Sequence, residues 1–134
     1  MPNNPSTDGR KYDLEERTAK FGEDVVRYCN DLPRNDITRP LINQLVKCGT
    51  AVGANYCEAD DAESKADFRH KIGLCKKESR ECKHFLRMLK VAVSEMVEQT
   101  QKLWTEAKEL NLILTQFTRS LSSLDISAWD LVIF

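Results

Sequence analysis

The residues of this chain with the most reactive side chains are two histidines and five cysteines. No two cysteines have the CxxC spacing typical of zinc or redox sites. Four of them fall on the apolar faces of expected helices, which favours small buried thiols over a disulfide or redox role. His70 and His84 fall on the polar side of the helix that carries two of these cysteines, so we expect no metal site. The cysteines are Cys29, Cys48, Cys57, Cys75 and Cys82.

Glu78 and Glu81 are the next residues that could do chemistry. They fall on an arc that is otherwise apolar, and a buried carboxylate is costly unless it is paired or hydrogen-bonded. We therefore expect them to contact Arg, Lys or amide groups of a neighbouring helix. Gln44, Asn55 and Glu58 of the preceding helix are expected to join them in a polar packing layer. A di-metal bundle is the alternative, but it needs Glu-x-x-His motifs that face inward.

Enzyme chemistry has little support in this sequence. Neither histidine is placed to activate a serine or threonine, and no Gly-rich loop follows a strand, because no strand is predicted. We expect a protein that is not an enzyme and has no cofactor. The apolar runs fall far below the ~20 residues that span a bilayer, and residues 1–11 lack the apolar core of a signal peptide. A cytoplasmic protein without membrane contact is therefore expected.

A concentration of positive charge marks residues 65–92, which carry nine Lys and Arg against three Asp and Glu, in a chain of net charge −1. Six of these cations recur at steps of 7, 4, 3, 4 and 3, which places them on one flank of a helix, called here the basic ridge. The ridge is either a solvated charged face or, repeated in an oligomer, a surface for nucleic-acid phosphates. No aromatic residue interleaves it, so binding should follow backbone charge or shape. The ridge consists of Arg69, Lys76, Arg80, Lys83, Arg87 and Lys90.

Four amphipathic helices are predicted to position these groups, each with an apolar seam that alternates steps of three and four residues. Asp13 and Glu16 form a capping box that begins the first helix, and Pro33 ends it. Thr38 is the predicted cap of the second helix, with Pro40 in its first turn.

Ser64 is predicted to cap the third helix, with Asp67 at its third position, and this helix should run to about Val97. The fourth should end near Leu124. Short connections between four helices predict an all-α, antiparallel up-down four-helix bundle. The expected parts are a disordered lead-in (1–12), the bundle (13–125) and an apolar C-terminal tail (126–134).

Gly49 and Gly53 lie four residues apart on one face of the second helix. Each glycine inside a helix costs roughly 1 kcal/mol relative to alanine. We therefore expect both glycines to allow a neighbouring helix to approach closely.

The apolar arc of the third helix is unusually wide, at about 200° when residues are placed 100° apart. An isolated bundle needs only a stripe of about 100°. Self-association is the economical explanation, and a thicker contact within the chain is the alternative. The predicted oligomer interface is Leu74, Glu78, Glu81, Phe85 and Met88.

The C-terminal tail is rich in apolar residues, which should dock somewhere because a free apolar terminus is a liability in water. One interpretation is docking on its own bundle or on a sister subunit. The other is a linear motif offered to a different protein. The docking residues would be Trp129, Leu131, Ile133 and Phe134.

Two groups of residues resemble sequence elements of a family of bacterial four-helix bundle proteins. The proteins of this family are encoded in intervening sequences of large-subunit ribosomal RNA genes. Ala54, Asn55 and Glu58 match its Ala-Asn-x-x-Glu element, and Ser64 and Lys65 match its Ser-Lys pair. The resemblance implies a ring-shaped, non-catalytic pentamer. It also implies a relation to accessory bundle proteins of diversity-generating retroelements, which bind nucleic acid and a reverse transcriptase.

These observations favour a non-catalytic oligomeric bundle that acts as a nucleic-acid-associated scaffold or accessory protein, for RNA or DNA, with the basic ridge as its contact surface. The alternative is a protein–protein adaptor that docks a partner through its apolar tail and has no nucleic-acid role. The two differ in salt dependence, because phosphate contacts weaken steeply as salt rises and apolar docking does not.

Overall fold

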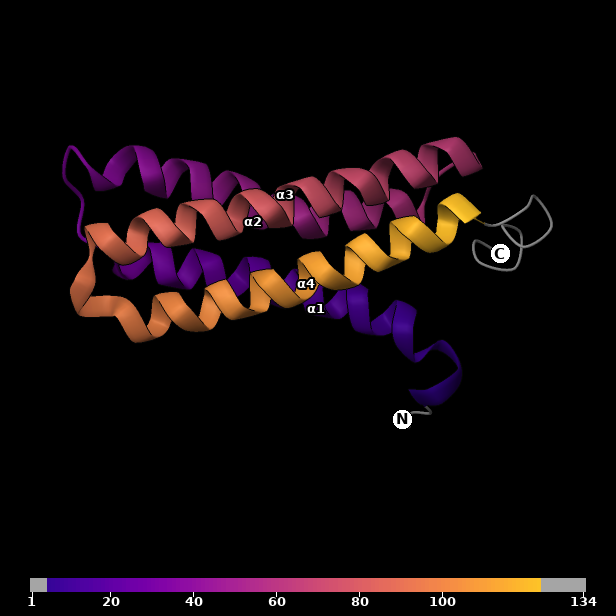
Figure 1. The fold of residues 1–134 in the computed structure, drawn as a ribbon, viewed down its shortest axis with the longest axis horizontal. Coiled ribbons are helices and arrows are strands. Elements are labelled where there is room, and N and C mark those ends of the chain that lie inside the picture. The colour runs from indigo at the N-terminus through magenta and orange to yellow at the C-terminus, as the bar shows by residue number, and fades with distance from the viewer. Residues whose placement is uncertain (1–4, 124–134) are drawn as a thin grey trace.

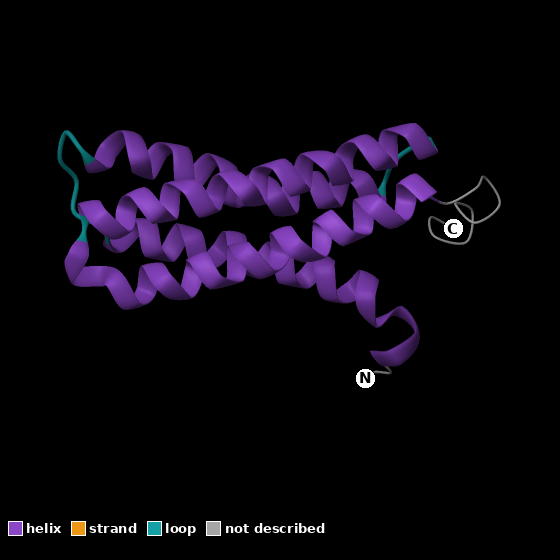
Figure 2. Cartoon of the chain, viewed as in Figure 1, coloured by secondary structure: helices purple, strands orange, loops and turns teal. Residues whose placement is uncertain are grey.

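The structure, a computed structural model, describes the backbone of residues 5–123 and the side chains of residues 14–121. Four long helices run antiparallel along one axis and form the predicted four-helix bundle (Figure 1). No strand occurs in the described residues (Figure 2), and no helix among them is long and apolar enough to cross a bilayer. The helices are α1 (Pro5–Asp31), α2 (Thr38–Asp60), α3 (Lys65–Ala92) and α4 (Val97–Ser123), with a short 3₁₀ turn, η1 (Ser94–Met96), before α4.

Helix α1 begins earlier than the capping box predicts. We expected residues 1–12 to be disordered and Asp13 to begin the helix, but α1 starts at Pro5. Proline is tolerated in the first turn of a helix, and no further proline follows until Pro33, so nothing stops the helix from extending back past Asp13. These first turns point away from the other three helices (Figure 1).

The start of α2 also differs from the prediction. Thr38 does not cap the helix: Asn35, in the turn just before it, accepts hydrogen bonds at its Oδ1 from the amides of Ile37 and Thr38, both at 2.9 Å. The Thr38 hydroxyl instead donates to the Pro33 carbonyl at 2.6 Å and accepts from the Asn35 amide at 3.0 Å. Asparagine and threonine are both good caps, so the local sequence does not decide between them.

The predicted cap of α3 is confirmed, since Ser64 Oγ accepts from the Asp67 amide at 3.0 Å. The predicted end is wrong: α3 stops at Ala92, and Val93 leaves helical geometry with its side chain buried. The Val93 amide still donates to the Leu89 carbonyl at 2.9 Å, and η1 then reverses the chain into α4. Neither glycine nor proline marks this boundary in the sequence.

The four predicted seams face one another and form a single core. All eight seam positions of the predicted third helix are buried, seven of them in α3 and the last just after it: Phe68, Ile72, Cys75, Ser79, Cys82, Leu86, Leu89 and Val93. The buried polar seam residues are satisfied within their own helices: Ser79 donates to the Lys76 carbonyl, and Thr18 donates to the Glu15 carbonyl. Most of the stabilising apolar burial therefore comes from positions that heptad spacing identifies.

Helices α1 and α4 make the least extensive contact of the four neighbouring pairs, and polar groups hold it together. Arg17 of α1 donates two hydrogen bonds to Glu106 of α4, at 2.7 and 2.9 Å, and a third, at 2.7 Å, to Glu109. These bonds raise the pKa of the Arg17 guanidinium above its usual value. Further along, the Tyr28 hydroxyl lies 2.6 Å from that of Thr100 in the core.

The close approach predicted at the α2 glycines is confirmed. A Cβ on Gly49 would lie 2.8 Å from a methyl carbon of Val25, and one on Gly53 would lie 3.2 Å from the Thr18 carbonyl oxygen. Both contacts are with α1, so the two glycines set the α1–α2 spacing.

The cysteines occupy the predicted environments. Cys57 is exposed, whereas the other four are buried and all five are free thiols. Burial raises the pKa of Cys29 to about 11 and that of Cys75 to about 12, which disfavours the reactive thiolate. The Cys82 and Cys48 sulfurs lie 3.4 Å apart in the core, and the pKa of Cys82 is raised by this contact and by burial.

This arrangement predicts how the thiols react. With a thiol reagent such as dithionitrobenzoate at pH 8, one thiol per folded chain should react within seconds and the other four only after unfolding in guanidinium. In a Cys57→Ser variant the fast phase should disappear. Two or more fast thiols in the native protein would contradict the described packing.

Candidate nucleic-acid interface on helix α3

The basic ridge lies on the flank of α3 that is next to α4. Asn111 of α4 fixes this arrangement, because its Nδ2 donates to the Lys76 carbonyl at 3.0 Å and to Ser79 Oγ at 3.1 Å. From first to last residue the ridge follows about 30 Å of helix, at 1.5 Å per residue. Four of its side chains are exposed and two are half-buried; the exposed ones are Arg69, Arg80, Arg87 and Lys90, and the half-buried ones are Lys76 and Lys83.

No ridge cation forms an ion pair with any carboxylate in the described part of the chain. Glu106 and Glu109 of the adjacent helix α4 are directed to α1, where both bind Arg17. By contrast, Lys20 and Arg27 of α1 pair with carboxylates of their own helix. The ridge is therefore a run of positive charge with little local neutralisation, available to an external anion.

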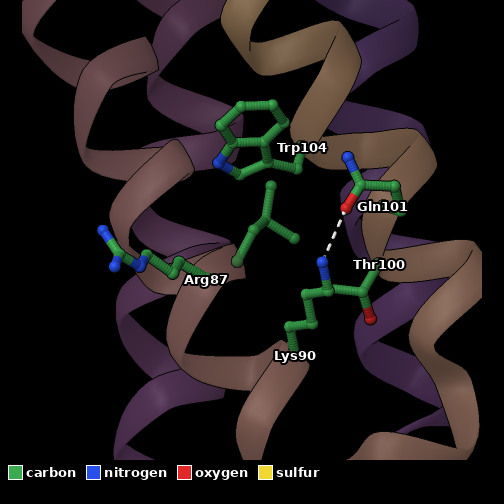
Figure 3. Close-up of a pocket in the computed structure, with 6 residues that line it drawn as sticks. Arg87, Lys90, Thr100, Gln101 and Trp104 are labelled. Atoms are coloured by element: carbon green, nitrogen blue, oxygen red, sulfur yellow. Dashed lines mark hydrogen bonds between the residues drawn. The ribbon is translucent and has the colours of Figure 1, made fainter.

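A pocket of about 350 Å³ lies at the C-terminal end of the ridge, between α3 and the start of α4. Arg87 and Lys90 come from α3, and Gln101 and Trp104 come from α4 (Figure 3). Lys90 Nζ donates to Gln101 Oε1 at 3.0 Å and so bridges the two helices. Thr100 and Leu86 complete the lining.

The structure places one aromatic residue, Trp104, beside the ridge, although we expected none there. Within α3 that expectation holds, but the antiparallel turn brings the first turns of α4 beside the last turns of α3. Trp104 is half-buried, and Lys108 Nζ lies 5.5 Å from the centre of its ring. The sequence contains one sign of this placement. Trp104 directly follows Leu103, an apolar seam residue of the fourth helix, and so falls on the edge of the apolar face of that helix.

The opposite flank of α3 carries the predicted oligomer interface. All five of its residues are half-buried within the single chain. Burial raises the pKa of Glu78, and the neighbouring Glu81 carboxylate adds to this, while Lys77 and Lys47 oppose it. Self-association through this flank stays a prediction. The residues are Leu74, Glu78, Glu81, Phe85 and Met88.

The predicted polar layer does not form as one network. Asn55 Nδ2 donates to the carbonyl of Ala51 in its own helix, at 2.9 Å. Glu58 pairs with Lys71 at 2.6 Å near the α2–α3 connection, and Gln44 is exposed. The hydrogen bond to the Ala51 carbonyl satisfies Asn55, and the ion pair with Lys71 satisfies Glu58. Neither residue therefore needs Glu78 or Glu81 as a partner.

Metal binding gains no support from the geometry. Glu81 and His84 do have the Glu-x-x-His spacing, but His84 is exposed, and its ring packs edge-on against Phe85 with centroids 5.1 Å apart. Among the described residues, no three His, Cys, Asp or Glu side chains are grouped closely enough to hold a metal ion.

The proposed docking residues of the tail, Trp129, Leu131, Ile133 and Phe134, lie outside the described residues.

The fold and the ridge define an all-α, antiparallel four-helix bundle with one positively charged flank. Residues 10–116 match the family described as 23S rRNA-intervening sequence protein, and the chain belongs to this family. A solved structure of a protein of unknown function from the S23 ribosomal protein family of Bacteroides thetaiotaomicron is similar, with 25% sequence identity and a TM-score of 0.74. The match covers 81% of this chain and 97% of that chain. No curated protein matches.

Proposed function

We propose that this protein is a non-catalytic RNA-binding bundle that holds RNA along the basic ridge of α3. The observation that carries the proposal is the row of six ridge cations, none of which forms an ion pair with a carboxylate in the described residues. Exposed Arg and Lys side chains spaced along about 30 Å suit a polyanion better than a small anion.

The separation of charge within the bundle also supports this proposal. Net charge −1 for the whole chain gives no general attraction for nucleic acid. Residues 65–92 carry nine Lys and Arg against three Asp and Glu, so the attraction is confined to α3. Because Arg17 draws Glu106 and Glu109 to the far side of α4, these carboxylates do not offset the ridge.

Salt dependence of RNA binding tests this proposal. We expect a fluorescently labelled single-stranded RNA of about 20 nucleotides to bind with an affinity that falls steeply between 50 and 300 mM KCl. For three to six phosphate contacts the slope of log K against log [KCl] should be about −2 to −4. A neutral morpholino oligomer of the same sequence is the control and should not bind. Absence of RNA binding at 50 mM KCl, or an affinity that does not change with salt, would overturn the proposal.

A further inference from the structure

The pocket at the end of the ridge combines an aromatic wall with cations. Its lining is mostly apolar and includes the Trp104 ring and the fully buried Leu86. Arg87 and Lys90 line it from α3, and the Lys90 ammonium lies at Gln101 (Figure 3). A simple anion site would not need an aromatic surface, and a simple apolar site would not carry two cations.

The size and polarity of the pocket narrow the choice of ligand. Ligand pockets typically measure about 300–1,000 Å³, so a volume of about 350 Å³ fits a single small planar group and its immediate attachments. The Thr100 hydroxyl is already bonded to the Met96 carbonyl and to Tyr28, and the Gln101 carbonyl oxygen is bonded to Lys90. Few polar groups therefore remain to select one planar ring over another.

We propose that this pocket accepts one unpaired nucleotide of a single-stranded RNA, with the base stacked on Trp104 and the adjoining phosphates on Arg87 and Lys90. Stacking on an aromatic side chain tolerates every base, because every base has a π-face. This inference rests on the proposed RNA binding and adds a preference to it. Paired bases in an A-form duplex stay stacked on their neighbours, so a duplex can reach the ridge cations but not the pocket.

The test compares three RNAs of equal length: a single strand, a duplex and a single strand made of abasic nucleotides. Replacing Trp104 by leucine should weaken binding of the ordinary single strand about tenfold, the scale of one base-stacking interaction. Binding of the duplex and of the abasic strand should stay within about twofold of wild type, because both rely on phosphate contacts. Trp104→Phe keeps an aromatic face and should retain most of the single-strand affinity.

Phe117→Leu is the matched control, since Phe117 is also a half-buried aromatic residue of α4 but packs against Phe68, with ring centroids 6.0 Å apart, far along the helix from Trp104. It should leave the affinity for all three RNAs unchanged. A second readout uses the Trp129→Phe background, in which Trp104 is the one remaining tryptophan of two. Its emission should be quenched by the single strand and unaffected by the duplex.

The outcomes separate this inference from the proposed function. If the leucine variant binds the single strand as wild type does, or loses affinity equally for all three RNAs, the stacking pocket is wrong and RNA binding by the ridge stands. If the wild-type protein binds none of the three RNAs, both proposals fail.

Discussion

Replacing Arg80, Lys83 and Arg87 together by glutamate should lower the affinity for RNA at least 100-fold at 100 mM KCl. The substitutions exchange three positive charges for three negative ones in the middle and C-terminal part of the ridge. Without these cations fewer counterions are released from the RNA on binding, and each new carboxylate repels the RNA backbone. The slope of log K against log [KCl] should also fall, by about 2. Fluorescence anisotropy across a salt series measures both quantities.

A charge-matched variant separates ridge contacts from net charge. Lys20, Arg27 and Arg39 each pair with a carboxylate of α1 or of the turn before α2. Reversing these three changes the total charge by the same amount but leaves the ridge intact, so the affinity should fall less than fivefold. All six substituted residues but one are exposed, so both variants should keep the helical circular dichroism of wild type. Equal losses of affinity in the two variants would mean that the ridge has no special role.

Alanine substitution should have opposite effects on stability at Gly49 and at Gly73. A Cβ at Gly49 would lie 2.8 and 2.9 Å from the two methyl carbons of Val25, which is fully buried. Valine is stiff about χ1, so the helices must move apart, and overpacking of this kind costs about 1–3 kcal/mol. After the gain in helix propensity, we expect Gly49→Ala to lower the free energy of unfolding by about 1–2 kcal/mol.

Gly73 provides the comparison, because a Cβ there would meet nothing within 4 Å. Gly73→Ala should therefore raise the free energy of unfolding by up to about 1 kcal/mol, the difference in helix propensity between glycine and alanine. Urea unfolding followed by circular dichroism measures both changes with one method. The same sign of effect at both positions would contradict the close α1–α2 contact.

The sequence predicted the helical seams well because burial in a bundle follows a short-range period. Heptad spacing alone placed Ile72, Cys75 and Leu86 in the core, and all three are fully buried. The cap of α3 was equally readable, since Ser64 and Asp67 satisfy a local rule that needs no tertiary information. The same reasoning identified Gly49 and Gly53 as sites of close approach.

Features that depend on chain reversal were not predictable from local pattern. The end of α3 at Ala92 is set by burial of Val93 and by η1, and the residues around it favour no particular stop. The position of Trp104 beside the basic ridge depends on the antiparallel register of α3 and α4, which the pattern of either helix alone does not reveal. The partners of Asn55 and Glu58 likewise depend on which groups happen to be nearest in space.

Ultraviolet cross-linking of bound RNA tests most directly whether RNA lies along the basic ridge of α3. A uridine-rich single-stranded RNA would be irradiated with the full-length protein, and the cross-linked peptides would be identified by mass spectrometry after digestion. We expect cross-links within residues 76–90 of α3 and at Trp104 of α4. Cross-links confined to α1 or α2, or none to the ridge and Trp104, would contradict it.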